Sequence, residues 1–141
     1  MKNIKKIFLL FTVMLMTTTS VFASTGSGLE NDINLSCVGK DNAGNICYID
    51  VSTLTYDTNK KEAMFKYITD SPKYNNFIVW NYTISYSKNW CQVDSPYIFE
   101  YGSKYGIDKG QRASAVEREP IKPGSFDEYI KTIVTNLIKQ Q

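Results

Sequence analysis

The 141-residue sequence contains no histidine at all. Histidine is the commonest general base and the commonest zinc ligand, so its absence excludes Ser–His and Cys–His nucleophile pairs. Three cysteines without a CxxC spacing are too few for a cysteine-only metal site. There is no glycine-rich phosphate loop either, because Gly102, Gly106 and Gly110 lie in a polar turn region. We therefore predict no catalytic site, no metal and no cofactor.

Long apolar runs are also missing. The longest covers about ten residues near the N-terminus, between Lys2, Lys5 and Lys6 on one side and a small-residue stretch ending at Ala23 on the other. This order of regions is typical of a cleaved secretory signal peptide. Because roughly 20 apolar residues are needed to span a bilayer, we expect no permanent membrane anchor. The sequence predicts a signal peptide over residues 1–23 and an exported protein in the periplasm, at the cell surface or outside the cell.

Clustered basic residues are lacking once the signal peptide is set aside. Its three lysines leave 13 basic residues against 14 acidic ones, a net charge near −1. Nucleic-acid binding needs clustered Lys and Arg to displace counterions, so this charge pattern argues against it. The remaining length suits one domain and not two. We expect a flexible polar leader over 24–33 and a single domain over 34–141.

Short strands separated by turns predict a sheet in the middle of the chain. The clearest is 76–87, where Trp80, Tyr82, Ile84 and Tyr86 alternate with polar residues, as in an antiparallel sheet covered on one side. Pro96 should mark an edge position or a bulge. The other expected strands are 35–38, 46–50, 54–57, 62–69, 90–101 and 112–118.

The chain changes character after 120–124. Ser125 and Glu128 have the spacing of a capping box, and apolar residues then recur at helical spacing. These residues are Phe126, Tyr129, Ile130, Ile133, Val134, Leu137 and Ile138. Such an apolar stripe must be covered, so we predict an α+β fold in which about six antiparallel strands carry one C-terminal helix on one face.

Three cysteines are disulfide candidates, since export places them where disulfides persist: Cys37, Cys47 and Cys91. A hairpin centred on Asn42 would put Cys37 opposite Cys47, although a slip of one residue would break that pairing and Cys91 remains an alternative partner. One thiol is left over in any case. It is either buried or available for a disulfide-linked homodimer.

A row of aromatic residues is the candidate binding strip: Tyr97, Phe99 and Tyr101 on one strand face, followed by Tyr105. Tyrosine and tryptophan are enriched at binding interfaces, so an exposed row would serve recognition. The alternative is that the row faces the helix and belongs to the core.

Paired carboxylates are the remaining route to catalysis, because two acids can hydrolyse a glycosidic bond without histidine. Glu117 and Glu119 share a strand face, and Asp94 and Glu100 would do so if Pro96 inserts no bulge. Nothing in the sequence pairs these acids across a cleft, so we interpret them as solvated edge charges. A small hydrolase that uses only carboxylates is a distant alternative.

Two patches resemble a known family. The segment from Tyr48-Ile49-Asp50 to Tyr56-Asp57 and the segment Ile121-x-Pro123-Gly124-Ser125-x-x-Glu128 are similar to the surface-adhesin E-like family of small exported bacterial proteins. The chain departs from that family at Leu35 or a neighbouring residue, where members commonly begin the first strand with tryptophan, and at Cys47 and Cys91. The resemblance implies an antiparallel sheet with a C-terminal helix and a role at the cell envelope.

We therefore expect a non-enzymatic binding module whose partner is a protein, with host extracellular-matrix proteins as the partners that the resemblance implies. The sheet surface and its exposed edge would carry the contacts. The alternative is a periplasmic structural or assembly module that serves another envelope protein.

Overall fold

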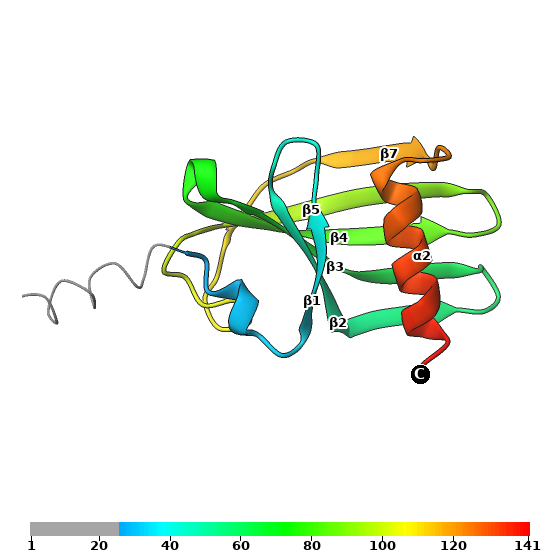
Figure 1. The fold of residues 1–141 in the computed structure, drawn as a ribbon, viewed down its shortest axis with the longest axis horizontal. Helices are drawn as coiled ribbons and strands as arrows, with labels where there is room; N and C mark the ends of the chain where they lie inside the picture. The colour runs from blue at the N-terminus through cyan, green and yellow to red at the C-terminus, as the bar shows by residue number, and fades with distance from the viewer. Residues whose placement is uncertain (1–25) are drawn as a thin grey trace, which may run out of the picture.

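The computed structural model describes residues 26–141, so the predicted signal peptide lies outside the described residues. This part of the chain forms seven strands and one long helix, α2 (Phe126–Ile138), which are shown in Figure 1. Two short 3-10 turns, η1 (Leu29–Asn31) and η2 (Pro72–Tyr74), complete it. The strands are β1 (Leu35–Lys40), β2 (Ile46–Asp57), β3 (Glu62–Ser71), β4 (Asn76–Ser85), β5 (Trp90–Glu100), β6 (Gln111–Arg112) and β7 (Val116–Pro120).

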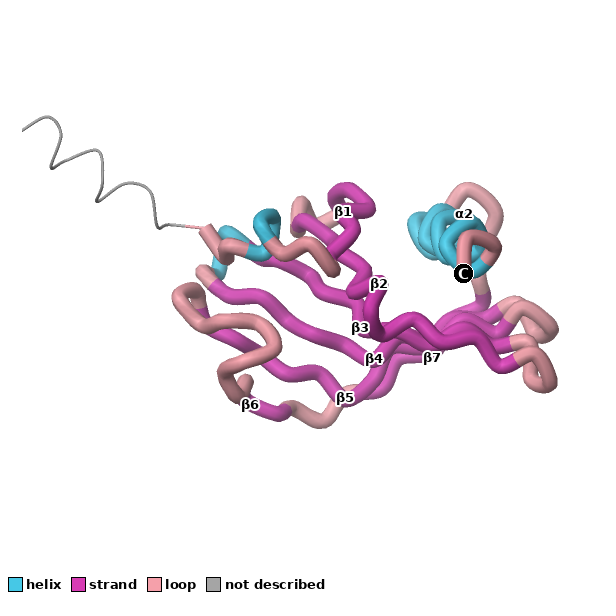
Figure 2. The backbone as a smooth tube through the Cα atoms, turned by 90° about the horizontal axis from the view of Figure 1, so that it is seen from below, coloured by secondary structure: helices cyan, strands magenta, loops and turns pink. Residues whose placement is uncertain are grey.

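The strands form one antiparallel sheet. Strands β1 to β5 are neighbours in chain order, and both β6 and β7 pair with the outer side of β5. Strand β6 covers Tyr97 and Ile98, whereas β7 runs alongside Trp90 to Asp94. Helix α2 lies across one face of this sheet (Figures 1 and 2). The predicted α+β class, with one C-terminal helix on a mostly antiparallel sheet, is confirmed.

Strand β2 replaces two predicted strands. Its pairing with β3 shifts between Asp50 and Thr55 instead of ending there. The Asp50 carboxylate accepts hydrogen bonds from the N–H of Ser52 at 3.0 Å and from its hydroxyl at 2.5 Å. The hydroxyl of Thr53 accepts the N–H of Lys66 at 2.8 Å. Side chains thus satisfy the backbone where the ladder is interrupted, and the strand continues.

The bulge expected at Pro96 is present. The register between β4 and β5 shifts between Val79 and Asn81, and Ser95 has the left-handed φ of 49°. Beyond this point the prediction of one strand over 112–118 is wrong. The segment divides into the two-residue β6 and the separate β7, because each pairs with β5 on a different side of the bulge.

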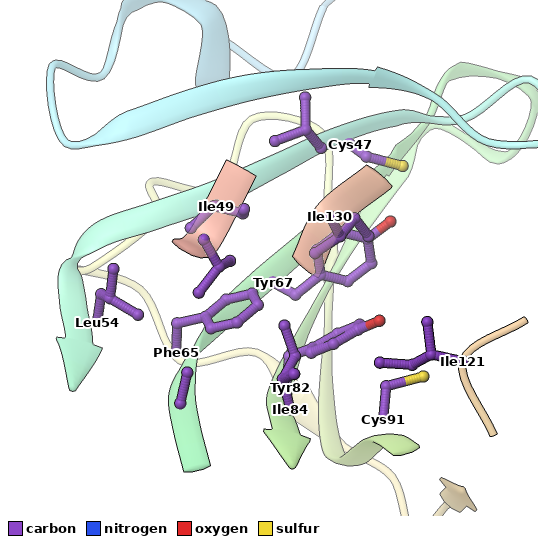
Figure 3. Close-up of a cluster of buried hydrophobic side chains, with 13 residues drawn as sticks. Cys47, Ile49, Leu54, Phe65, Tyr67, Tyr82, Ile84, Cys91, Ile121 and Ile130 are labelled. Carbon is purple, nitrogen blue, oxygen red and sulfur yellow. The ribbon is translucent and has the colours of Figure 1, made fainter. Parts of the chain in front are cut away.

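The expected cover for the helix stripe is confirmed. Ile130 and Val134 are 1% and 0% exposed and pack into a first core with residues of the sheet, shown in Figure 3. Tyr129 is an exception, since it is 52% exposed. At the helix start, the Ser125 hydroxyl accepts the N–H of Glu128 at 3.2 Å, but the Glu128 carboxylate accepts from the N–H of Gly124 instead of that of Ser125.

A second core lies on the opposite face of the sheet. It contains Tyr48 and Ile68, whereas their chain neighbours Ile49 and Tyr67 belong to the first core. Successive side chains of a strand point to opposite faces, so the two cores use the two faces of one sheet. Leu29 of η1 is 3% exposed and packs into the second core. From Gly26 onward the expected flexible leader therefore lies against the sheet, because Leu29 is buried there, although Ile33 at its end stays exposed.

Two buried aspartates hold the covering segments in place. Asp70 is 4% exposed, and its carboxylate accepts a hydrogen bond from the Tyr101 hydroxyl at 2.5 Å and another from the Ser27 hydroxyl. Asp50 accepts from the Tyr105 hydroxyl at 2.6 Å. Burial and these carboxylates raise the pKa of both tyrosines, so the hydroxyls stay protonated as donors. The loop after β5 and the segment before β1 are thereby attached to the sheet.

Candidate functional site

The aromatic strip proposed from the sequence belongs to the second core. Phe99 is 8% exposed and stacks on Phe77 with ring centroids 4.9 Å apart. Tyr97, Tyr101 and Tyr105 pack around it as partly buried neighbours. The core interpretation is therefore the better one, but the row faces away from the helix. The bulge at Ser95 and Pro96 causes this, because it turns the second half of β5 over.

The cysteines lie in three separate places and are all free. Cys37 is exposed and lies opposite Tyr48, while Gly39 lies opposite Cys47. The expected direct opposition of Cys37 and Cys47 is wrong, because the hairpin turn is centred on Ala43 instead of Asn42, and the bulge in β1 then places Cys37 opposite Tyr48. Cys47 and Cys91 are buried in the first core, whereas Cys37 lies opposite Tyr48 of the second core, so its side chain lies on the other face of the sheet.

The sheet face opposite the helix is not covered by the second core along its whole length. It is open where the other side of the sheet carries the first core. A ladder of polar side chains crosses four strands here. The ammonium of Lys66 donates to Asn81 Oδ1 at 2.6 Å, and Asn81 Nδ2 donates to Asp94 Oδ1 at 3.3 Å. Gln92 Nε2 donates to Asp94 Oδ2 at 2.9 Å, and Arg118 Nε donates to Gln92 Oε1 at 2.8 Å. We call these five residues the polar ladder.

The ladder has one carboxylate at its centre. Asp94 is half-buried, and hydrogen bonds from Gln92, Ser95 and Asn81 outweigh this burial and lower its pKa. At the outer end, the Arg118 guanidinium lies over the Trp90 ring, 4.3 Å from its centroid. The surface thus combines planar polar groups with one aromatic ring, and tryptophan and arginine are enriched at protein interfaces.

Strand β7 forms the free edge beside the ladder, and all five of its residues are exposed. Arg118 lies opposite Gln92 on the open face, whereas Glu119 lies opposite Cys91 on the helix face. Hydrogen bonding with Glu119 and repulsion between the two carboxylates raise the pKa of Glu117. Figure 1 shows β7 as the last strand on this side of the sheet.

Neither carboxylate pair singled out in the sequence frames a cleft in the way that glycoside hydrolysis requires. Asp94 and Glu100 lie on opposite faces, since the bulge separates them. Glu117 and Glu119 are neighbours on an exposed edge. Within residues 26–141, no three metal-ligating side chains gather into a group that could hold an ion. Of the helices described, none is long and apolar enough to cross a membrane.

Sequence reasoning missed the polar ladder. Its members come from four strands, and only the register brings them together. One local signal was available: Gln92 and Asp94 alternate with Cys91 and Val93 on a single strand, which predicts a polar face there.

The fold and the surface together define a small α+β domain with one helix-covered face, one partly open polar face and one free strand edge. Two solved structures share this fold, and both are of protein E from Haemophilus influenzae. One has 15% sequence identity and a TM-score of 0.50, covering 77% of this chain and 97% of that chain. Its selenomethionine form has 13% identity and a TM-score of 0.50, covering 74% of this chain and 95% of that chain.

At this level of identity the likeness concerns the fold alone. No protein-family model matches the sequence. A search of curated proteins also gives no match.

Proposed function

We propose that this chain is an exported protein of the bacterial cell envelope that acts as a non-enzymatic binding module for another protein. The observation that carries the proposal is the fold shared with protein E, combined with an open polar face beside a free strand edge. Attachment to host extracellular-matrix proteins is the role implied by the sequence resemblance. The signal peptide over 1–23 and a single domain over 34–141, with residues 26–33 packed against it, form part of this proposal.

The exposed surface supports binding better than chemistry. The open face presents donors and acceptors from Lys66, Asn81, Asp94 and Gln92, and Trp90 with Arg118 at its margin. Arginine and tryptophan are enriched among residues that dominate protein interfaces. A chain without histidine lacks the usual general base, so a surface of this kind is better suited to recognition.

Protease treatment of intact cells tests the location. A surface protein is cleaved without breaking the cells, and a periplasmic marker protein in the same sample stays intact. If the chain is protected like the marker, the adhesin role is refuted and the periplasmic assembly module takes its place.

Binding itself is tested with the purified exported protein on immobilised matrix proteins, with albumin as the control surface. We expect retention at micromolar concentration, and loss of retention when Arg118 and Gln92 are both changed to alanine. A matched variant, Tyr129→Ala, changes an exposed aromatic on the helix and should be retained as the wild type is. No retention of the wild-type protein on any matrix protein would contradict the host-binding role.

A further inference from the structure

The two long edges of the sheet differ in what they offer to another strand. Strand β1 has a bulge between Cys37 and Gly39, so its outer edge is irregular. Strand β7 pairs with β5 in an uninterrupted register from Val116 to Pro120. An extended peptide can therefore continue the sheet at β7 more readily than at β1.

The backbone groups that point outward from β7 follow from its hydrogen bonds to β5. The N–H of Ser95 donates to the carbonyl of Ala115 at 3.2 Å, and the N–H of Ile121 donates to the carbonyl of Asn89 at 3.0 Å. In an antiparallel ladder, alternate residues bond to the same neighbour. The backbone N–H and C=O groups therefore point to β5 at residues 115, 117, 119 and 121. Those of Val116 and Arg118 point to the free side.

The side chains at this edge define the chemistry of a partner. Glu117 and Glu119 lie on the helix face, and the charged groups that act on Glu117 are Glu119 and Asp127, both acidic. Opposite charges on directly paired residues stabilise a sheet, and like charges destabilise it. A partner strand with lysine or arginine opposite the two glutamates would relieve this repulsion.

The same charges disfavour the self-pairing of β7 that is centred on Arg118. A two-fold antiparallel pairing centred on Arg118 would place the two Arg118 side chains opposite each other and Glu117 opposite Glu119 of the second copy. A second copy of this chain is therefore a poor occupant, and a foreign basic segment is a good one.

We propose that β7 is a docking edge for an extended segment of another protein that carries basic residues at alternate positions, which adds to the sheet as a further strand. The inference rests on the proposed binding function and names the partner's chemistry and the surface that it uses. Val116, 70% exposed, and the exposed Pro120 leave room for small or β-branched residues at the intervening positions.

A fluorescent peptide with the repeat Thr-Lys-Val-Lys is the probe, and anisotropy at low salt measures its binding to the purified exported protein. The control peptide has the same composition with its lysines adjacent. We expect the alternating peptide to bind at least about tenfold more tightly, since only its lysines all reach one face of a strand. Equal affinity for both peptides, or no binding of either up to about 1 mM, a concentration that corresponds to only weak association, would overturn the proposal.

Val116→Pro and Val116→Ala form a matched pair of variants. Proline removes an N–H that makes no bond within the sheet, so the fold should tolerate it at this edge position while strand addition is blocked. We expect Val116→Ala to bind as the wild type does and Val116→Pro to lose at least about tenfold in affinity, a measurable shift in Kd. Equal binding by Val116→Pro would refute strand addition.

Hydrogen exchange of the wild-type protein keeps the test decisive if Val116→Pro fails to fold. Peptide binding should slow exchange of the Val116 and Arg118 amides and leave the Glu117 amide unchanged, since Glu117 already bonds to β5. Binding without this protection would mean that the glutamates attract lysines without strand pairing. Val116→Pro could lose the peptide and still be retained on matrix proteins. In that case the β7 edge is not the surface that binds matrix proteins, and the proposed binding function stands without it.

Discussion

Burial sets the reactivity of the cysteine residues individually. Burial raises the pKa of the Cys47 thiol to about 11, and it raises the pKa of Cys91 as well. The nucleophile is the thiolate, so both residues should be inert at neutral pH. Cys37 is exposed on β1 and has no such protection.

We therefore predict one reactive thiol per chain when the reduced native protein is treated with iodoacetamide at pH 8, and three in denaturant. Mass spectrometry after digestion should place the native label on Cys37, and the Cys37→Ser variant should take up none. Reactivity of Cys47 should rise only as the pH approaches 11, because the thiolate forms above the raised pKa. Labelling of two thiols in the native protein at pH 8 would contradict the buried positions of Cys47 and Cys91.

The same experiment without reductant tests the disulfide prediction. An exported protein with a bridge would show fewer thiols in denaturant than the reduced protein. A bridge between two copies through Cys37 would also double the apparent mass on a non-reducing gel.

At the scale of elements, helix α2 depends on its first turn. The hydroxyl of Ser125 accepts the Glu128 N–H, and the Glu128 carboxylate accepts the Gly124 N–H at 2.7 Å. Asp127 also accepts a hydrogen bond from the buried Tyr82 hydroxyl at 2.7 Å, which joins the helix start to β4. These contacts fix where the helix begins and how it meets the sheet.

Ser125→Ala should lower the free energy of unfolding by about 1 kcal/mol, the usual cost of removing a serine cap. Chemical denaturation followed by circular dichroism measures the change. Thr132→Ala, an exposed position in the middle of the helix, is the control and should stay within about 0.5 kcal/mol of the wild type or gain slightly. Equal losses from both variants would show that the cap contributes nothing specific.

The predictability of each element depends on how local its determinants are. The helix was predictable because Ser125 and the apolar stripe from Phe126 to Ile138 lie within a short stretch of chain. The split of 111–120 into β6 and β7 was not, since it depends on the bulge at Pro96 in a strand far upstream. The continuity of β2 was also missed. Asp50 and Thr53 are residues that favour turns, but here their side chains accept backbone N–H groups where the pairing with β3 is interrupted.

The candidate surface was less predictable than the fold. Contacts through the sheet surface and its exposed edge stay a prediction, whereas Phe99 proved to be core, with Tyr97 and Tyr101 packed against it. The polar ladder requires the register of three strand pairs, and no local pattern contains that register.

At the scale of the whole molecule, the second core makes the segment before β1 part of the fold. Leu29 packs against the cluster that includes Ile68 and Phe77, and Ser27 is tied to Asp70. The two cores share strands β2 to β5, so loss of one should weaken the other.

Leu29→Ala should lower the free energy of unfolding by about 2–4 kcal/mol, within the range for removing a buried leucine. The matched control is Ile33→Ala, since Ile33 is 95% exposed and its truncation should change stability by less than about 0.5 kcal/mol. Thermal and urea unfolding measure both variants. If Leu29→Ala is as stable as Ile33→Ala, the segment before β1 does not contribute to the core.

The two-faced packing of β3 also constrains how the chain can change in length during evolution. Tyr67 and Ile68 serve different cores, so inserting a single residue before them would exchange their destinations and those of every later side chain in the strand. The hairpin turn at residues 58–61 belongs to neither core, so an insertion there changes the face of no buried side chain. Descendants of this sequence should therefore accumulate insertions in that turn and keep the residue count of β3 constant.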